Sequence, residues 1–251
     1  MLRRALAGAT MRLRNRWRRK RLLANSGLRL HLGCGGDKLG QFINLDTRHT
    51  AATDIVMDLS LPGFRTGSVA LAFSNAFFEH LYRDAHVPHL ARIYEALEAT
   101  GTCCYIGIPY FPNIARFYLE GAPGIVGSRF DLYNVYRYTH GDPEQAGAIG
   151  WWLEQLHKSL FDEHELSRIL RESGFRNFVQ FSYAYPGEGL VVSMGFFASR
   201  DARAPERLRE DSRRLLATLD GKKIRMETLQ WLDAADASAA SHTNQPTERS
   251  A

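Results

Sequence analysis

The sequence has few cysteines and no long apolar run, and each shortage excludes a class of protein. Its 251 residues contain three cysteines, Cys34, Cys103 and Cys104, without a Cys-x-x-Cys or histidine-spaced pattern, so no disulfide framework or zinc finger is expected. No apolar segment approaches the ~20 residues of a membrane-spanning helix. The N-terminus also lacks the apolar core and cleavage site of a secretory signal. These absences predict a cytoplasmic protein with reduced thiols.

Acidic residues are absent from the first 27 residues, which carry nine of the chain's 32 Lys and Arg. The remaining 23 bases face 27 acids, so the net charge of +5 comes from this arm. A body that bound nucleic acid along its surface should itself be basic, and no nucleic-acid partner is expected. In residues 1–26 apolar side chains recur at helical spacing, which is typical of a helix on an anionic membrane surface or on a protein partner. A solvated tail and a mitochondrial transit peptide are the alternatives.

Strand-like and helix-like segments alternate between residues 27 and 200. Strands are predicted at residues 28–32, 42–46, 54–58, 69–74, 102–109, 177–185 and 190–199. One helix is predicted from about residue 84 to Gly101, and another from Asp162, with Glu165 in a capping-box-like position, to Gly174. The alternation predicts an α/β fold with a doubly wound, mostly parallel seven-stranded sheet. Because only a short Pro-Gly turn separates the last two strands, the last strand should be antiparallel.

Three zones are expected along the chain: a basic arm at 1–26, one domain at 27–200, and a tail at 201–251 that is helical and then disordered. An aromatic, glycine-rich insertion at 110–156 follows the fifth predicted strand. Only residues 34–41 separate the first two strands, fewer than the ~10–12 residues of a usual parallel crossover. The first helix should therefore be shortened to a tight loop or a single turn.

Glycines follow the first strand directly, in Leu30-His31-Leu32-Gly33-Cys34-Gly35-Gly36. Glycine at such a bend lets the backbone turn tightly and approach a ligand. A dinucleotide fingerprint needs a third glycine where Lys38 stands, which disfavours a nicotinamide-dependent oxidoreductase. The next two strands end in Asp46 and Asp58, at the edge where open α/β sheets bind ligands. These acids suit a nucleoside's ribose hydroxyls and adenine amino group; solvated strand ends are the alternative.

The sequence contains four segments typical of one family: LHLGCGGDKLGQFINLD, DIVMDLSLPGF, SNAFFEHL and GTCCYIGIP. They resemble class I (Rossmann-like) methyltransferases that use S-adenosyl-L-methionine. Members of that family are often found in bacterial surface-polysaccharide and sugar-modification gene clusters. The resemblance covers residues 28 to 174 and includes the abbreviated crossover. It implies a methyltransferase with that cofactor. The implied cofactor-binding residues are Gly33, Cys34, Gly35 and Gly36 at the methionine part, Asp46 at the ribose, Asp58 and Leu59 at the adenine, and Asn75, with the Glu79-His80 pair, at the pocket wall. One departure is His31, where that family often has an acid.

Methyl transfer chiefly requires alignment of the two reactants and exclusion of water, so no covalent residue is needed. A sugar hydroxyl is a poor nucleophile and would benefit from a general base. The candidates are His140 and His157, with His80 on the opposite wall; polar surface residues are the alternative interpretation. No metal site is expected, because the acids and histidines show no ligand spacing.

The insertion carries many aromatic residues, which suit a sugar-stacking wall or lid, or else a small hydrophobic subcore. They are Phe111, Phe117, Tyr118, Tyr133, Tyr136, Tyr138, Trp151 and Trp152. The leading hypothesis is O-methylation of a sugar, glycan or other small-molecule acceptor in polysaccharide biosynthesis, with the basic arm holding the enzyme at the inner face of the membrane. The alternative is a cofactor-binding or degenerate methyltransferase fold that acts as a scaffold in a glycan-assembly complex.

Overall fold

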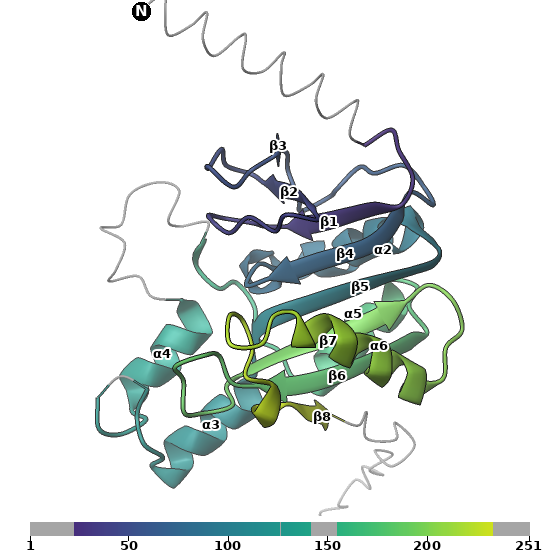
Figure 1. Ribbon diagram of the computed structural model, residues 1–251. Helices are drawn as coiled ribbons and strands as arrows, with labels where there is room; N and C mark the ends of the chain where they lie inside the picture. Colours follow the sequence, from purple (N-terminus) through teal and green to yellow (C-terminus); the bar gives the residue numbers. More distant parts are fainter. Residues whose placement is uncertain (1–22, 126, 142–154, 233–251) are drawn as a thin grey trace, which may run out of the picture.

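A single eight-stranded sheet runs through the chain, in the order β3-β2-β1-β4-β5-β7-β6-β8 (Figure 1). The computed structural model describes residues 23–125, 127–141 and 155–232. Most of the predicted arm, Trp151, Trp152 and the end of the tail lie outside the described residues. The strands are β1 (Leu28–Leu32), β2 (Ile43–Asp46), β3 (Ile55–Val56), β4 (Val69–Asn75), β5 (Leu97–Pro109), β6 (Asn177–Tyr183), β7 (Ser193–Ser199) and β8 (Gln230–Leu232).

Five neighbouring strands, from β3 to β5, are parallel, and β7 lies antiparallel between β5 and β6. The predicted fold class is therefore confirmed: the seven expected strands are present and the last of them is antiparallel. The carboxyl ends of β1, β2, β3 and β4 share one edge of the sheet because these strands are parallel. Loops that follow those strands are thereby brought together, as ligand sites of open α/β sheets require.

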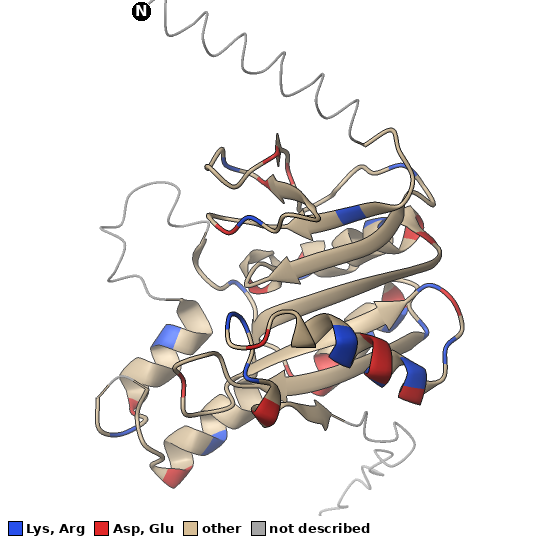
Figure 2. Ribbon diagram, in the orientation of Figure 1, with Lys and Arg blue, Asp and Glu red and all other residues tan. Residues whose placement is uncertain are grey.

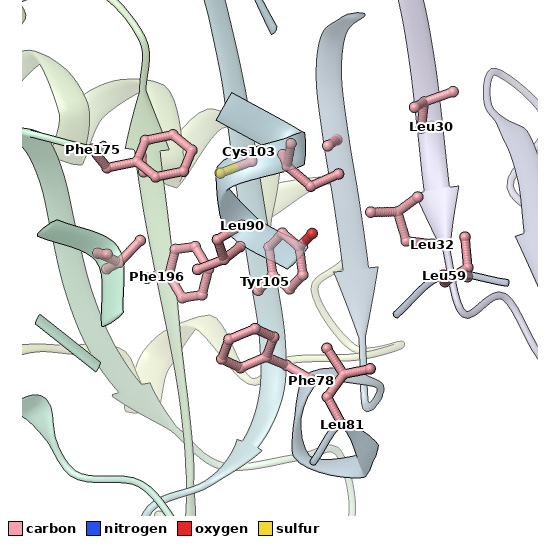
Figure 3. Close-up of a cluster of buried hydrophobic side chains, with 14 of the residues drawn as sticks. Leu30, Leu32, Leu59, Phe78, Leu81, Leu90, Cys103, Tyr105, Phe175 and Phe196 are labelled. Atoms are coloured by element: carbon pink, nitrogen blue, oxygen red, sulfur yellow. The ribbon is translucent and has the colours of Figure 1, made fainter. Parts of the chain in front are cut away.

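Helices cover both faces of the sheet. The helices are α2 (His86–Ala96), α3 (Phe111–Glu120), α4 (Leu132–His140), α5 (Glu163–Glu172) and α6 (Pro205–Ala217). Leu90 of α2 and Leu166 of α5 pack with Tyr105 and Phe196 on one face, part of the cluster in Figure 3. On the other face α6 packs against β6 and β7, and its buried side chains share a cluster with Cys104 of β5. Alternate residues of β5 thus point to opposite cores, as the pleat dictates.

Charged residues of both signs alternate on the exposed side of α6, as Figure 2 shows. Arg207 pairs with Glu210 and Asp211, while Arg214 pairs with Glu210 one turn away. Such pairs at i,i+3 and i,i+4 stabilise a helix by about 0.2–0.5 kcal/mol each. No helix among the described residues combines the length and apolar character needed to cross a membrane.

Three local details test the predicted boundaries. Asp162 caps α5 by accepting from the Glu165 amide, and Gly174 (φ +103°) follows its end, as predicted. The helix predicted to reach Gly101 ends instead at Ala96, because Leu97 already pairs with Val69 as the start of β5. Gly101 therefore lies within a strand.

The tail holds one strand that the sequence analysis did not predict. β8 pairs antiparallel with β6, and Trp231 packs edge-on against Phe181 with a ring-centroid distance of 5.8 Å. The sheet consequently has eight strands where seven were predicted. The burial of one aromatic side chain stabilises a pairing that three residues would not sustain alone.

The insertion after β5 forms α3 and α4, which pack around a small core of their own. Phe117, Tyr118 and Tyr138 join Phe130 in this cluster. Phe111 and Tyr136 are exposed. Phe117, Tyr118 and Tyr138 therefore belong to a hydrophobic subcore, as one of the two interpretations predicted. None of the described aromatic residues of the insertion lines the cavity described below.

Candidate functional site

A cavity of about 440 Å³ opens at the carboxyl ends of β1, β2 and β4. The described residues that line it are Gly33, Cys34, Gly35, Asp37, Asp46, Thr47, Arg48, Asp58, Leu59, Ser60, Asn75, Ala76, Phe77, His80, Leu81, Tyr82, Ala85, Gln155, Lys158 and Lys223. Of the eight predicted cofactor-binding residues, the structure brings seven together here. Gly36 is the exception: it is exposed and does not line the cavity.

The glycine loop follows β1 as a sharp bend. Gly33 adopts φ +67° and Gly35 φ +53°, a region that side chains with a Cβ disfavour. A Cβ on Gly33 would lie 2.7 Å from the Phe77 ring, whereas one on Gly35 would meet no described atom within 4 Å. Between them the Cys34 thiol is buried, and burial raises its pKa to about 11, so this thiol stays protonated and is not a nucleophile at neutral pH.

Asn44, a fully buried residue of β2, holds the shortened crossover in place of a helix. Its side-chain nitrogen donates to the carbonyl oxygens of Leu39 and Phe42 and to Asp54 Oδ2, while its oxygen accepts from the Leu39 amide at 2.9 Å. Asp54 also pairs with Lys38 at 3.0 Å. The predicted shortening of the first helix is confirmed, and side-chain hydrogen bonds satisfy the backbone groups that a helix would have paired.

The two predicted acids differ in their surroundings. Asp46 is 5% exposed, and its carboxylate accepts from the backbone amides of Gly35 and Arg48, each at 2.8 Å. Oδ1 also accepts from the Thr47 hydroxyl and lies 3.5 Å from Arg48 Nε, whereas Oδ2 accepts only from Gly35 among the described residues and so retains one lone-pair site. Asp58 is exposed, and one of its oxygens accepts from the amide and hydroxyl of Ser60. Asp46 thus couples the glycine loop to β2, while Asp58 stands at the rim.

A buried histidine fixes the wall at Leu59. His89 of α2 donates from Nδ1 to the Leu59 carbonyl oxygen and accepts at Nε2 from the Tyr105 hydroxyl, both at 2.7 Å. Burial lowers the pKa of His89 to about 4, which keeps the ring neutral and holds this tautomer. The Leu59 backbone is thereby tied to α2 and β5.

The opposite wall follows β4, where the backbone is under strain. Ala76 adopts φ +51°, the only positive φ of a non-glycine residue in the described ranges. Gly107 of β5 lies so close that a Cβ there would fall 2.5 Å from the Ala76 amide nitrogen. Asn75 accepts from the Tyr185 hydroxyl at 2.6 Å. Strained backbone of this kind clusters at ligand sites, where the surrounding structure holds it in place.

The three histidines predicted as catalytic candidates occupy different positions. His80, in the short helix η1 (Phe78–His80), lines the cavity with the glycine loop. His157 lies beside it, with a ring-centroid distance of 5.1 Å, and lines a neighbouring cavity of about 540 Å³. His140 lines that second cavity but is exposed, with its ring stacked on Tyr136. Neither His140 nor His157 reaches the first cavity.

Glu79 is buried next to these histidines, with 1% of its surface exposed. Its Oε1 lies 3.7 Å from His80 Nε2, and its Oε2 has no hydrogen-bond partner among the described residues. Burial raises the pKa of Glu79 to about 8 and lowers the pKa of His80 to about 4. Ligand atoms of Glu79, His80 and His157 lie within 4.8 Å of one another. The sequence analysis expected no such convergence.

Basic side chains at the cavity were also missed. Arg48 lies 3.5 Å from the Asp46 carboxylate, Lys223 pairs with Asp37 at 3.0 Å, and Lys158 lines both cavities. No sequence pattern indicated that Lys223 is near the cavity. Lys223 follows α6, which packs on the sheet, and only the folded chain brings it beside Asp37.

No protein-family model matches the chain, and no curated protein does. Among solved structures it is similar to a methyltransferase dependent on S-adenosylmethionine from Methanosarcina mazei (12% identity, 71% of this chain and 94% of that chain covered, TM-score 0.48). Another from Archaeoglobus fulgidus has 14% identity, 75% and 93% coverage and a TM-score of 0.45. The 1,6-didemethyltoxoflavin-N1-methyltransferase of Burkholderia thailandensis, with bound S-adenosylhomocysteine, has 15% identity, 77% and 79% coverage and a TM-score of 0.42. Function therefore has to be inferred from this chain's own residues.

Proposed function

We propose that this chain is a methyltransferase that uses S-adenosyl-L-methionine. The observation that supports the proposal is a single cavity lined by three features. They are the glycine loop with Gly33 (φ +67°) and Gly35 (φ +53°), the buried carboxylate of Asp46 at the end of β2, and the exposed carboxylate of Asp58 after β3. Its volume of about 440 Å³ lies in the usual range of small-molecule sites.

The residues fit each part of such a cofactor. Gly35, where a Cβ would meet no described atom within 4 Å, leaves the loop backbone open to the amino-acid portion, and Oδ2 of Asp46 suits a ribose hydroxyl. Asp58 at the rim suits the adenine amino group, with apolar Leu59 beside it. The bound cofactor would supply an activated methyl group, and the chain's contribution would be to align an acceptor and exclude water.

The acceptor would enter from the side of His80 and His157, where the second cavity begins. We propose a small molecule or glycan that presents a hydroxyl oxygen, in line with the sequence resemblance. His80 is the histidine best placed to act on it, because it alone of the three candidates lines the cofactor cavity. Burial lowers the pKa of His80 to about 4, so its ring is neutral at neutral pH; because a group of such low pKa is a weak base, we propose that it positions the acceptor hydroxyl by a hydrogen bond.

Calorimetric titration with S-adenosylmethionine and S-adenosylhomocysteine tests the proposal. Asp58→Ala should weaken binding about 10- to 100-fold, since a hydrogen bond to a charged group contributes about 1.5–3 kcal/mol. Asp58 is exposed, so the variant should fold. Asp84→Ala, which removes an exposed acid outside the cavity, is the matched control and should bind as the wild type does. Absence of binding at millimolar ligand would refute the proposal.

A further inference from the structure

Three side chains that the sequence places far apart converge beside the proposed cofactor cavity. Glu79 and His80 come from η1, directly after β4, and His157 comes from the segment that follows the insertion. Each offers one ligand atom, and these atoms lie within 4.8 Å of one another. We propose that Glu79, His80 and His157 form a binding site for a divalent transition-metal ion of the zinc type.

Main-chain carbonyl oxygens orient both histidine rings of the cluster. His80 Nδ1 lies 3.3 Å from the Leu156 carbonyl oxygen, and His157 Nδ1 lies 2.8 Å from that of Tyr138. A carbonyl can only accept, so Nδ1 of His157 carries the proton and its lone pair stays on Nε2. Metal-binding histidines almost always donate their other nitrogen in this way, which fixes ring orientation. The His80 ring bonds the backbone of both Leu156 and Ala76, and a metal ion would have to replace one of these contacts.

The segment that carries His157 is pinned against η1 independently of any ligand. The Lys158 amide donates to the Glu79 carbonyl oxygen at 2.8 Å, and the His157 amide donates to that of His140 at 3.2 Å. The three side chains are consequently held together by main-chain hydrogen bonds.

Glu79 supplies the observation that points to an ion. Its Oε2 is buried without a hydrogen-bond partner among the described residues, an arrangement that costs free energy unless something binds there. Lys158 is not a hydrogen-bond partner of this oxygen; its ammonium donates to the His80 carbonyl oxygen and lies 4.8 Å from the Tyr82 ring centre. A cation between Glu79 and the two rings would satisfy the carboxylate.

The donor set favours a particular kind of ion. Two imidazole nitrogens and one carboxylate oxygen match the three protein ligands of many catalytic zinc sites, while magnesium and calcium prefer all-oxygen sites. Ligands around tetrahedral zinc stand roughly 3.4 Å apart, given bonds of about 2.1 Å. The 3.7 Å between Glu79 Oε1 and His80 Nε2 is close to that separation. Because the three ligand atoms lie within 4.8 Å of one another, an ion would have to draw the more distant pair closer.

The location suggests what the remaining position of the ion would bind. His80 lines the cavity with the glycine loop and His157 lines the second cavity, so the ion would lie at their junction. An acceptor hydroxyl bound there would become a better nucleophile, because the ion lowers its pKa. That extension rests on the proposed methyl transfer, whereas the ion site does not.

Metal binding by the full chain tests the site directly. Protein stripped with a chelator is titrated with Zn²⁺ by calorimetry, and with Co²⁺ by visible absorption, which reports tetrahedral coordination. We expect one ion per chain, at least 100-fold weaker binding in Glu79→Gln and His157→Ala, and much weaker binding of Mg²⁺. His164→Ala, which removes an exposed histidine on α5, should bind normally. Circular dichroism checks that each variant is folded.

Three results would overturn the site: no stoichiometric Zn²⁺ or Co²⁺ binding, unchanged binding in folded Glu79→Gln and His157→Ala, or equal loss in His164→Ala. The same samples, titrated with S-adenosylhomocysteine, separate this proposal from the proposed function. Bound metal without cofactor binding would refute only the methyltransferase. Cofactor binding without metal would refute only the ion site.

Discussion

Gly33 and Gly35 form a matched pair that isolates the effect of one steric contact. Both have a positive φ, so alanine at either position should cost about 1–2 kcal/mol in backbone conformation alone. Of the two, only Gly33 has a described neighbour with which the new Cβ would collide, 2.7 Å from Phe77 Cδ2 and 2.8 Å from Phe77 Cβ. The contact with Cβ cannot be relieved by rotating the ring. Overpacking of this kind costs a further ~1–3 kcal/mol.

We therefore expect Gly35→Ala to lower the free energy of unfolding by about 1–2 kcal/mol and Gly33→Ala by about 2–5 kcal/mol. In a chain of this size each kcal/mol corresponds to roughly 2–4 °C in melting temperature. Urea unfolding followed by circular dichroism measures both variants beside the wild type. Equal destabilisation of the two variants would show that Phe77 does not confine the loop as described.

Three further predictions concern buried polar groups. Asn44→Ala should lower the free energy of unfolding by about 2–3 kcal/mol, measured by urea denaturation, because it leaves several loop groups unpaired; a loss below ~0.5 kcal/mol would contradict its role in the crossover. His89, with its pKa lowered from 6.5 to about 4, contributes stability that is present above pH 6.5 and lost as pH falls toward 4, on the order of 3 kcal/mol. His89→Gln should remove that part of the pH dependence in thermal unfolding, and parallel profiles for the two proteins would refute it. The cysteines Cys34, Cys103 and Cys104 are buried, with pKa values raised by desolvation, so iodoacetamide should label them at neutral pH only after unfolding; rapid labelling of the folded chain, detected by mass spectrometry, would show otherwise.

The sheet was predictable because local patterns agreed with long-range pairing. Alternating strand and helix signals located seven strands, and the glycine loop with its two acids was found because parallel strands end at one edge. The helix expected to end at Gly101 shows the opposite case. Its helical pattern was overruled by the pairing of Leu97 with Val69, which no local signal encodes.

The histidine cluster could not be predicted in the same way. His80 and His157 meet because residues 156–158 bond to the backbone and side chains of η1 and to the backbone of α4, contacts between segments that lie far apart in the sequence. The role of Asn44 left a weak signal, since asparagine is depleted in strand interiors. A buried amide within an unusually short crossover is the pattern to look for in other sequences.

Within the described residues, the two edge strands of the sheet are short: β3 has two residues and β8 has three. A long edge strand offers many unpaired backbone groups to which another chain can bind, whereas a short edge strand offers few. β8 covers part of the seven-residue β6, which would otherwise be the outermost strand. Loss of residues 205–232 would leave β6 without β8 as its neighbour, and we expect such a variant to self-associate more readily than the full chain.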